Sequence, residues 1–347
     1  MSLFDRDRSA ARMPVSLVTG FLGSGKTTLI NRLLRHPGMA ATLVVVNEFG
    51  DVGLDHLLYE RVDGETVLMQ SGCVCCTVRS DLETTLRDIA AKRAKGALPP
   101  FERVLIETTG LADPAPIVQL LLNHPLTAHD FRLDAVITTV DAVHGARQLD
   151  EHREPVKQAA IADRLLITKA DLATADQMQA LRLRLGFLNP GAGMHEVRHG
   201  AIEPERLFGA ALFDPARKTA DVRRWLNAEA YDAPVHAHDL NRHGTDIESF
   251  CLAFDEPLDW QAVHDWLAAI RRERGEDLLR VKGILNLAGE SAPVAIHGVH
   301  HVFHPPVQLE AWPEGDDRRS RIVFIMRGLD RAAIAESFAS FCIRAAA

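Results

Sequence analysis

The stretch VSLVTGFLGSGKTTLINRLL, residues 15–34, decides the fold of this chain. It opens with a run of apolar and β-branched residues that suits a strand buried on both faces. Gly20, four further residues and then Gly25-Lys26-Thr27 match the pattern G-x-x-x-x-G-K-[ST] in full. Apolar residues then recur with the spacing of one helix face. A strand, a glycine-rich loop and a helix in this order predict a phosphate-binding P-loop.

Each part of this loop suits a phosphate group. Glycines let consecutive backbone N–H groups point into one concavity, and the helix N-terminus adds partial positive charge. Lys26 supplies a point charge for the β- and γ-phosphates, and Thr27 offers its hydroxyl to Mg²⁺. From this loop we expect nucleotide contacts by Gly20, Gly23, Ser24, Gly25, Lys26, Thr27 and Thr28.

Downstream of the loop, short β-rich runs alternate with amphipathic helical stretches. This alternation is typical of an α/β fold in which a mostly parallel sheet is covered by helices on both faces. The clearest helices are expected at 80–96, with Ser80 or Asp81 as its N-cap, and at 174–188. Further strands are expected at 42–49, 66–71, 103–109, 134–141 and 164–171.

An acidic residue lies at the end of one of these strands. RVLIETTG, residues 103–110, places Glu107 there and Gly110 three residues later. A P-loop site needs such an acid near Mg²⁺, and Glu107 is long enough to hold a metal-bound water, so we interpret it as a variant of the usual Asp. A carboxylate that only caps the strand end is the alternative. The backbone N–H of Gly110 is expected to sense the γ-phosphate, and catalysis is assigned to Lys26, Thr27 and Glu107.

The nucleotide base is expected to meet the segment Thr168-Lys169-Ala170-Asp171, at the end of a buried strand. It is close to the Asn-Lys-x-Asp pattern by which GTPases recognise guanine. The Asp171 carboxylate can accept hydrogen bonds from guanine N1–H and the 2-amino group, which adenine lacks. Thr168 departs from the pattern, because it offers a hydroxyl where an amide would bridge to the loop. A plain turn between strand and helix is the alternative.

Bulk properties limit the remaining choices. A chain of 347 residues predicts two domains, which we expect at 1–225 and 247–347, joined by a linker at 226–246. The net charge of −8 argues against general affinity for polyanions, so no nucleic-acid partner is expected. No apolar run approaches the roughly 18 residues of a membrane span, and the N-terminal residues lack a secretory apolar region. We expect a soluble, cytoplasmic protein with no membrane partner.

Three of the five cysteines lie within four positions, at Cys73, Cys75 and Cys76. Adjacent cysteines and an odd total make a disulfide framework unexpected and favour a reducing compartment. The cluster suits a soft metal ion such as Zn²⁺, while core packing and a redox thiol pair are the alternatives. Because side chains alternate along a strand, the backbone must turn between Val74 and Cys76 for all three sulfurs to reach one ion.

Four segments in this order behind the P-loop resemble the CobW-type GTPases, proposed metallochaperones with zinc-transfer and cobalamin-biosynthesis members. They are VVVNEFGDVGLD (44–55), GCVCCTVRSDL (72–82), IETTGLADPAP (106–116) and TKADL (168–172). The resemblance continues over residues 247–343, which are similar to the C-terminal domain of that family.

This resemblance implies an activity and its cofactors. Such proteins bind GTP and Mg²⁺ at the P-loop, hydrolyse GTP slowly to GDP, and carry Zn²⁺, Co²⁺ or a related ion to a client metalloprotein. By the same resemblance the metal motif is Cys73, Cys75 and Cys76, and Glu48 in the switch-like segment 47–50 is the expected oxygen ligand. Co²⁺ and Ni²⁺ stay open beside Zn²⁺, as does a homo-oligomer.

The histidines and the C-terminal part say less about function than the motifs of the N-terminal part. His236, His238 and His243 mark the linker. The C-terminal part predicts an α+β domain, with strands at 248–255, 281–288, 293–304 and 321–327 and helices at 259–274 and from 330. If 293–304 is one strand, His297 and His301 share one face and His300 and His304 the other, and exposed histidines are the simplest expectation.

Two other functions compete with a metallochaperone GTPase. One is an ATP-using small-molecule kinase of the P-loop class with a structural zinc, against which Asp171 argues. The other is a non-enzymatic metal sensor or regulator in which the nucleotide tunes a partner contact.

Overall fold

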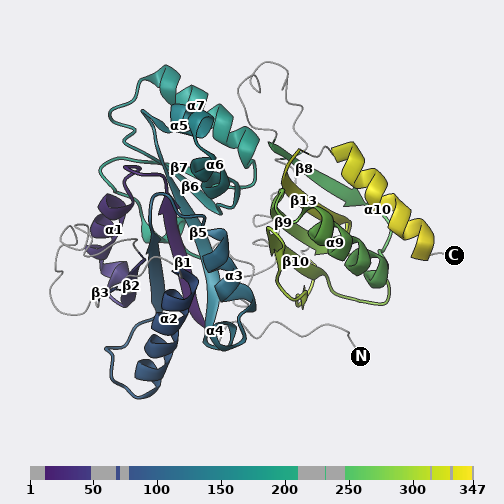
Figure 1. Ribbon diagram of the computed structural model, residues 1–347, viewed down its shortest axis with the longest axis horizontal. Coiled ribbons are helices and arrows are strands. Elements are labelled where there is room, and N and C mark those ends of the chain that lie inside the picture. Colours follow the sequence, from purple (N-terminus) through teal and green to yellow (C-terminus); the bar gives the residue numbers. More distant parts are fainter. Residues whose placement is uncertain are drawn as a thin grey trace. The chain divides into compact units, whose positions relative to one another are not determined.

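The computed structural model describes residues 12–47, 68–70, 78–209, 231, 247–312, 315–328 and 331–345 (Figure 1). The chain divides into two compact units, one of residues 11–183 and 192–213 and the other mainly of residues 214–347.

The first unit is built on a seven-stranded sheet in the order β3-β2-β4-β1-β5-β6-β7. Every neighbouring pair of strands in it is parallel, which confirms the predicted α/β class. The P-loop strand β1 lies at the centre, between β4 and β5. The strands are β1 (Met13–Gly20), β2 (Thr42–Asn47), β3 (Leu68–Gln70), β4 (Arg103–Thr108), β5 (Phe131–Asp141), β6 (Arg164–Thr168) and β7 (Gly193–Val197).

Helices cover both faces of this sheet (Figure 1). α1 packs into a buried cluster with Val18, Val44 and Leu105 on one face. On the opposite face, Thr138 of β5 donates a hydrogen bond of 2.8 Å to the carbonyl oxygen of Gln158 in α6. The helices are α1 (Lys26–Leu34), α2 (Val78–Ala94), α3 (Ala115–Asn123), α4 (Pro125–Asp130), α5 (Gly145–Glu151), α6 (Arg153–Ala160) and α7 (Ala175–Leu188), with two short 3₁₀ turns at Pro37–Met39 and Pro204–Arg206.

The start of one predicted helix differs from the structure in this unit. α2 begins at Val78, ahead of the predicted caps Ser80 and Asp81. Its far end agrees with prediction, because Gly96 adopts the left-handed conformation (φ 64°) that terminates helices. Strand β7 and helices α3 to α6 were not predicted.

The second unit has a six-stranded antiparallel sheet in the order β11-β10-β9-β13-β8, with β12 pairing to β10. Its strands are β8 (Ile247–Phe254), β9 (Leu278–Leu285), β10 (Val294–Val299), β11 (Val302–Phe303), β12 (Val307–Gln308) and β13 (Ser320–Arg327). Two helices, α9 (Trp260–Arg274) and α10 (Arg331–Ala345), complete the predicted α+β arrangement.

The core of the second unit forms around Trp266 of α9, which is fully buried. Its indole packs edge-on against Phe324 of β13 and Phe338 of α10, with ring centroids 5.8 and 4.7 Å apart. The indole N–H donates to Ser337 Oγ at 3.2 Å, which gives the buried polar atom a partner. Asp259 caps the start of α9 through the backbone N–H of Ala262, as the predicted helix at 259–274 requires.

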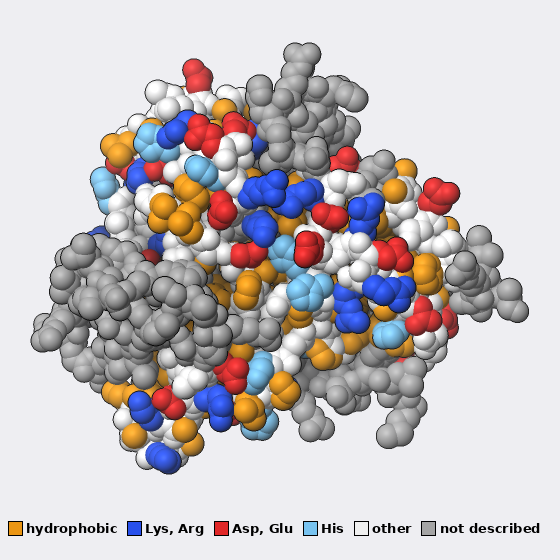
Figure 2. Space-filling model, in the orientation of Figure 1, with side chains coloured by type: hydrophobic (Ala, Val, Ile, Leu, Met, Phe, Trp, Pro, Cys, Tyr) orange, Lys and Arg blue, Asp and Glu red, His pale blue; other side chains and the backbone are white. Residues whose placement is uncertain are grey.

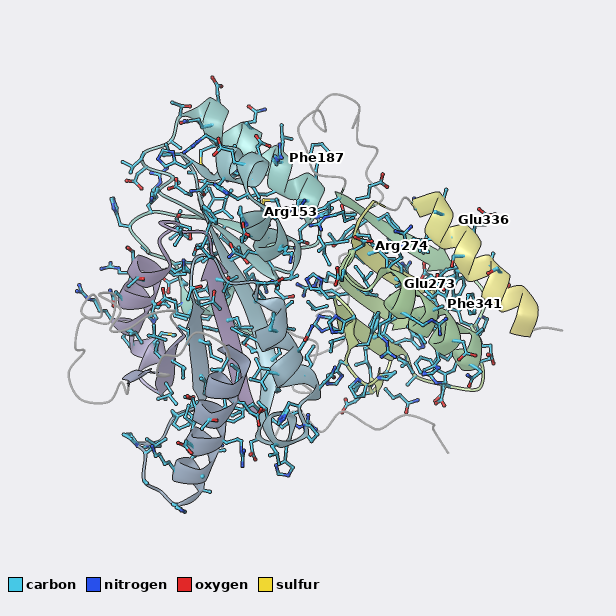
Figure 3. The ribbon with its side chains drawn as sticks, viewed as in Figure 1. Arg153, Phe187, Glu273, Arg274, Glu336 and Phe341 are labelled. Atoms are coloured by element: carbon cyan, nitrogen blue, oxygen red, sulfur yellow. The ribbon has the colours of Figure 1, made fainter. Side chains whose placement is uncertain are left out.

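The ends of these two helices are charged. α9 finishes in basic residues that suit the negative end of its dipole, and Figure 3 labels Arg274 there beside Glu273. Figure 3 also labels Glu336 and Phe341 on α10, of which Phe341 packs against the Trp266 core. The apolar sides of α9 and α10 therefore cover one face of the antiparallel sheet.

The predicted strand at 293–304 is wrong, because the chain turns at His300. His300 has a positive φ of 50°, and the turn separates β10 from β11. The expected pairing of histidines on strand faces therefore fails. His297 and His300 are also buried, at 5% and 7% exposure, where exposed side chains were expected. Ile296 joins the Trp266 core, so its neighbour His297 projects from the other face of the sheet.

Charge is mixed over the visible surface. Figure 2 shows Lys and Arg side chains interspersed with Asp and Glu across the described residues of that face. Among the described residues, no helix combines the length and the apolar character needed to cross a bilayer.

Candidate nucleotide-binding site

Four strands of the first unit end at one edge of the sheet. β1 ends at Gly20, β4 at Thr108, β5 at Asp141 and β6 at Thr168. Because the strands are parallel, their carboxyl ends meet at the same edge, where open α/β sheets bind ligands. The structure thus brings together the P-loop, the strand that carries Glu107 and the segment predicted to meet the base.

The P-loop is fastened to β5 by hydroxyl groups. Ser24 Oγ and Thr139 Oγ1 lie 2.7 Å apart, and Thr139 Oγ1 also donates to the carbonyl oxygen of Thr19 at 3.2 Å. Gly20 leaves no room for a larger residue, since a Cβ placed there would overlap both Oγ1 and the carbonyl oxygen of Thr139. The loop therefore depends on glycine at this position to approach β5 closely.

Lys26 lies across the loop that precedes it. Its Nζ donates to the carbonyl oxygens of Gly20 at 2.9 Å and Phe21 at 3.2 Å, and the residue is 9% exposed. Gly23 and Gly25 have positive φ angles of 70° and 94°, which turn the backbone into the helix N-terminus at Lys26. A fixed cation and a helix N-terminus at one point favour a phosphate group.

Thr27 and Glu107 meet across the site. Thr27 Oγ1 donates to Glu107 Oε1 at 2.9 Å, and Glu107 is 6% exposed. A hydroxyl and a carboxylate oxygen are hard ligands of the kind that Mg²⁺ takes together with waters and phosphate oxygens. The donor set at this position therefore fits Mg²⁺.

Thr168 makes the connection that the sequence pattern left in question. Its hydroxyl donates to the carbonyl oxygen of Ser24 at 2.7 Å, and the same atom lies 3.2 Å from the carbonyl oxygen of Val140. The hydroxyl thus bridges to the P-loop, as the amide of an Asn would. Although Thr168 departs from the pattern Asn-Lys-x-Asp, its hydroxyl keeps the contact between segment 168–171 and the P-loop.

The next residue, Lys169, is held by an acid that sequence reasoning missed. Lys169 has a positive φ of 55°, and its Nζ lies 2.6 Å from Asp141 Oδ2. Asp141 is 2% exposed, and the N–H groups of Val143 and His144 donate to its other oxygen at 2.8 and 3.1 Å. Burial raises the pKa of Asp141, but the hydrogen bonds from Lys169 and the two N–H groups outweigh it, so the net pKa lies below the ordinary 3.8.

Asp171 lies at the outer end of this segment. Its Oδ2 is 3.7 Å from Nε2 of His199, an 84% exposed side chain on the turn after β7. His199 and Gly200 both have positive φ, of 51° and 72°. The turn at 198–201 is therefore a second wall beside Asp171, and sequence reasoning missed it because β7 was not predicted.

The predicted zinc ligands Cys73, Cys75, Cys76 and Glu48 lie outside the described residues. The strands that lead to them are described. β2 ends at Asn47 and β3 at Gln70, and the register pairs Val46 with Gln70 and Asn47 with Thr108. Both strands therefore end at the edge that carries Thr27 and Glu107. Within the described residues, no three His, Cys, Asp or Glu side chains are grouped to hold a metal ion.

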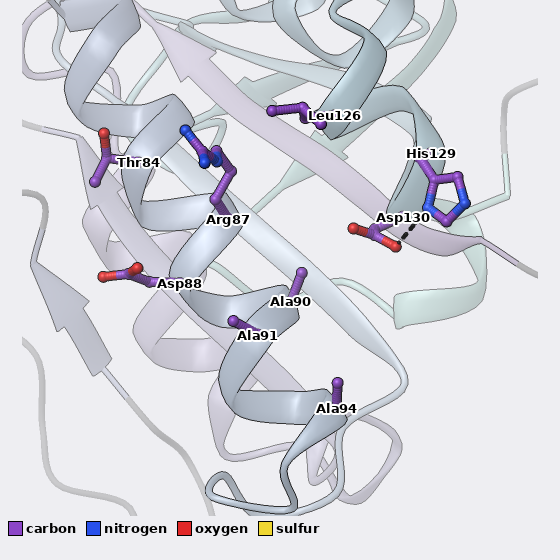
Figure 4. Close-up of a pocket in the computed structure, with 9 residues that line it drawn as sticks. All are labelled: Thr84, Arg87, Asp88, Ala90, Ala91, Ala94, Leu126, His129 and Asp130. Carbon is purple, nitrogen blue, oxygen red and sulfur yellow. Dashed lines mark hydrogen bonds and ion pairs between the residues drawn. The ribbon is translucent and has the colours of Figure 1, made fainter.

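A separate hollow lies between α2 and α4 (Figure 4). Its lining includes the small residues Ala90, Ala91 and Ala94 and the exposed pair His129 and Asp130, whose side chains lie 2.9 Å apart. These side chains do not converge on a common point in Figure 4. The residues predicted to bind the phosphates lie at the strand ends instead.

Comparison with known proteins gives matches over both units. The model of the CobW/HypB/UreG nucleotide-binding domain matches residues 14–196, and that of the cobalamin synthesis protein cobW C-terminal domain matches residues 247–342. The zinc chaperone YjiA of Escherichia coli is 33% identical over 94% of this chain and 97% of its own length. The zinc chaperone CobW of Pseudomonas aeruginosa is 30% identical, over 94% of this chain and 91% of its own.

A more distant relative and two crystal structures extend the comparison. The zinc-regulated GTPase metalloprotein activator 1 of Schizosaccharomyces pombe is 27% identical, over 95% of this chain and 86% of its own. The crystal structure of Zn(II)-bound YjiA GTPase from E. coli superposes with a TM-score of 0.73 at 29% identity, covering 95% of this chain and 99% of that one. A triple mutant of YjiA in which one glutamate and two cysteines are replaced by alanine is also Zn(II)-bound and gives the same TM-score. This chain therefore belongs to the CobW/HypB/UreG family of nucleotide-binding proteins and carries the C-terminal domain of CobW.

Proposed function

We propose that this chain is a GTP-binding metallochaperone that hydrolyses GTP slowly, binds Zn²⁺ and delivers it to a client metalloprotein. The observation that carries the proposal is the shared sheet edge. The two strands that precede the predicted zinc ligands, β2 and β3, end at the edge where Thr27 meets Glu107. The names of the relatives, which include zinc chaperones and a zinc-regulated GTPase, support the same function.

In this proposal the P-loop holds the phosphates and the 168–171 segment reads the base. Lys26 binds the β- and γ-phosphates, and Gly110 presents its N–H to the γ-phosphate. Thr168 and Lys169 order the base pocket through Ser24 and Asp141, and Asp171 accepts from guanine.

Hydrolysis needs few groups beyond those that bind. A water oxygen bonds to the γ-phosphorus while the bond to the β–γ bridging oxygen breaks, giving GDP and inorganic phosphate. Thr27 and Glu107 would hold Mg²⁺, which neutralises charge on the phosphate oxygens when bound. Lys26 stabilises the same charge from the protein. Positioning by these three residues suits slow turnover.

The metal is the cargo of the protein. Thiolates of Cys73, Cys75 and Cys76 with the carboxylate of Glu48 provide four ligands of the kinds that Zn²⁺ takes in tetrahedral sites. Co²⁺ and Ni²⁺ accept a similar set, so the residue types alone do not choose among them. We place this exchange in the cytoplasm, where thiols stay reduced.

Nucleotide and metal are coupled in this proposal. β2 and β3 end at the sheet edge that carries the groups assigned to Mg²⁺ and the γ-phosphate. We infer that hydrolysis changes the surroundings of the metal ligands that follow these strands in the sequence. Zinc affinity should therefore differ between the GTP and GDP states, and by reciprocity zinc should change the ratio of GTP affinity to GDP affinity by the same factor.

The test is a zinc titration by competition with a chelating dye under anaerobic conditions. Wild type is compared in the presence of a non-hydrolysable GTP analogue, of GDP and of no nucleotide, with Mg²⁺ present throughout. We expect one tight zinc per chain that is lost when Cys73, Cys75 and Cys76 are replaced together by Ala. Cys251→Ala is the matched control, because Cys251 is a buried thiol of β8 in the other unit.

The number of zinc ions bound tightly per chain decides the outcome. Since a YjiA mutant lacking two cysteines is still Zn(II)-bound, weaker zinc at other positions must be counted separately from the tight site. An unchanged tight site in the triple cysteine variant would remove the metal assignment. Equal zinc affinity in all three nucleotide states would remove the coupling but leave the metal site.

A further inference from the structure

Helix α6, Arg153–Ala160, lies beside the two loops that bind the phosphates in the proposed function. Figure 3 labels Arg153 at its start. No local sequence pattern singles out this helix. Its residue Gln158 is fully buried, at 0% exposure, although glutamine is usually exposed.

The side chain of Gln158 holds the loop that follows Glu107. Its Nε2 donates to the carbonyl oxygens of Gly110 at 3.2 Å and Ala112 at 3.0 Å. Two carbonyl acceptors fix the orientation of the amide, because the reversed orientation would set oxygen against oxygen. Both N–H donors of the amide are therefore used on one short loop.

The other amide atom of Gln158 has no such role. Oε1 is buried, and among the described residues it has no hydrogen-bond partner. A buried acceptor without a partner lowers stability, so an apolar side chain of similar size would suit packing better here. The residue is better explained by what its two donors hold than by its contribution to the core.

Gly110 is confined from the other side by the P-loop. A Cβ placed on Gly110 would lie 2.6 Å from Leu22 Cδ2 and 2.7 Å from the Leu22 backbone nitrogen. Leu22 is the second residue after Gly20, within the phosphate loop. Gly110 therefore lies between the P-loop and Gln158, with no space to shift toward Leu22.

Two further contacts join the same region to both loops. Lys157, next to Gln158, forms an ion pair with Asp113 at 2.7 Å. The ring of His152, directly before α6, stacks on Phe21 of the P-loop with centroids 4.8 Å apart. The α6 region thus contacts the P-loop at one end and the 110–113 loop along its length.

We propose that Gln158 is a positioning residue for recognition of the γ-phosphate, acting through Gly110. Gln158 fixes the carbonyl group of Gly110. It thereby also fixes the backbone N–H of Gly110, the group offered to the γ-phosphate, at a set position relative to the P-loop. The inference rests on the proposed function, in which Gly110 makes that contact. Because GDP has no γ-phosphate, Gln158 contributes to the preference for GTP over GDP and not to nucleotide binding in general.

The test measures the affinities of GDP and of a non-hydrolysable GTP analogue, with Mg²⁺, for wild type and Gln158→Met. Methionine keeps the length of the side chain without its donors. We expect the affinity for the GTP analogue to fall about 10-fold, in keeping with the loss of two neutral hydrogen bonds, while that for GDP changes less than about twofold. The kcat/KM for GTP should fall with the analogue affinity.

Gln119→Met is the matched control, because Gln119 is a buried glutamine on α3 in the same unit. It should leave both nucleotide affinities unchanged. If Gln158→Met does not fold, Gln158→Leu provides the same comparison with a smaller side chain.

The outcomes separate the two proposals. A wild type that binds neither nucleotide defeats the proposed function and this inference with it. A wild type that binds both nucleotides while Gln158→Met loses them equally, or loses neither, defeats the inference alone.

Discussion

Each sheet buries a group of polar side chains, and the two groups lie at different positions along their strands. In the parallel sheet of the first unit, buried Glu107, Thr108, Thr139 and Asp141 lie near the carboxyl ends of β4 and β5, where their hydroxyl groups and carboxylates bond to neighbouring loops and strands. In the antiparallel sheet of the second unit, buried Lys282 and its cross-strand neighbour His297 lie mid-strand, on the face away from the Trp266 core.

Strand direction explains this difference. Parallel strands all finish at one edge, so single polar residues far apart in the sequence meet there and build a site. Antiparallel strands finish at alternate edges, so polar residues meet across a face instead. We therefore predict that substitutions in the second unit change its stability, while those at the strand ends of the first change nucleotide binding.

The largest expected effect belongs to the core of the second unit. Trp266→Ala removes a fully buried indole and its contacts with Phe324 and Phe338, which should cost about 3–5 kcal/mol of unfolding free energy. Chemical denaturation followed by circular dichroism measures the loss. Trp260→Ala on the same helix is the control and should cost less, because Trp260 is only partly buried.

Binding of the GTP analogue to Trp266→Ala, under conditions where the second unit stays folded, makes the comparison sharper. We expect an affinity within about twofold of wild type, well inside the tenfold that about 1.4 kcal/mol represents. A large loss would mean that the polar site depends on the Trp266 core.

The next effect is at the P-loop. Lys26→Ala removes the cation proposed to bind the phosphates and should weaken binding of the GTP analogue by about 100-fold or more, since hydrogen bonds to charged groups are the strong ones. Calorimetric titration gives the affinity. Arg32→Ala, an exposed cation in the last turn of the same helix, should leave it unchanged.

All four tryptophans, Trp225, Trp260, Trp266 and Trp312, lie beyond residue 209. Thermal unfolding followed by tryptophan fluorescence therefore reports on residues outside the first unit. Lys26→Ala should leave the midpoint of this transition unaltered. A shifted unfolding transition would contradict the expectation that the strand ends of the first unit serve nucleotide binding while the Trp266 core serves stability.

A smaller effect is expected at Asp171, the residue proposed to recognise the nucleotide base. Asp171→Asn replaces an acceptor carboxylate by an amide that places a donor against the guanine N–H groups, so affinity for GTP should fall about 10-fold. Affinity for ATP, measured in the same way, should not fall. Asp176→Asn in the first turn of α7 is the matched control. Equal losses for GTP and ATP would show that Asp171 does not read the base.

The smallest effect concerns the pH dependence of stability. Because the folded-state pKa of Asp141 lies below its ordinary 3.8, the carboxylate stabilises the fold above that pH, and this contribution is lost as the pH falls through the folded-state pKa. Melting temperature should therefore fall more steeply below about pH 4 in wild type than in Asp141→Asn.

Lys169 supplies the control for this prediction. In a Lys169→Met background the Asp141 carboxylate loses its ion-pair partner, so adding the substitution Asp141→Asn should change the pH dependence of melting less than it does in wild type. Parallel curves for wild type and the single variant Asp141→Asn would contradict a lowered pKa at this position.

Local signals made much of the first unit predictable. The P-loop, its flanking strand and α1 follow from residues 15–34 because each rests on neighbours in sequence. Asp141 could have been found by the rule that identified Glu107, since it also ends a buried strand. Gln158 could not, because its partners Gly110 and Ala112 are 48 and 46 residues away and no local pattern marks the contact.

In the second unit, the sequence pattern of residues 293–304 led to a wrong prediction of one continuous strand. The segment 293–304 has the composition of one strand, and its turn contains His300 in a conformation that usually calls for Gly or Asn. Pairing with β9 buries His297, which its polarity argues against. These outcomes are set by tertiary contacts, which override local preference.

The central position of β1 also affects how the protein is made. The hydroxyl bonds that hold Ser24 reach residues 115 and 144 positions further along the chain. A ribosome must therefore synthesise residue 168 before the loop at residues 20–27 can acquire all its supports. Long-range parallel pairing of this kind folds slowly, and until then the apolar strand β1 is exposed to aggregation. We therefore expect the first half of the emerging chain to stay open to misfolding until the strands up to β6 have been made.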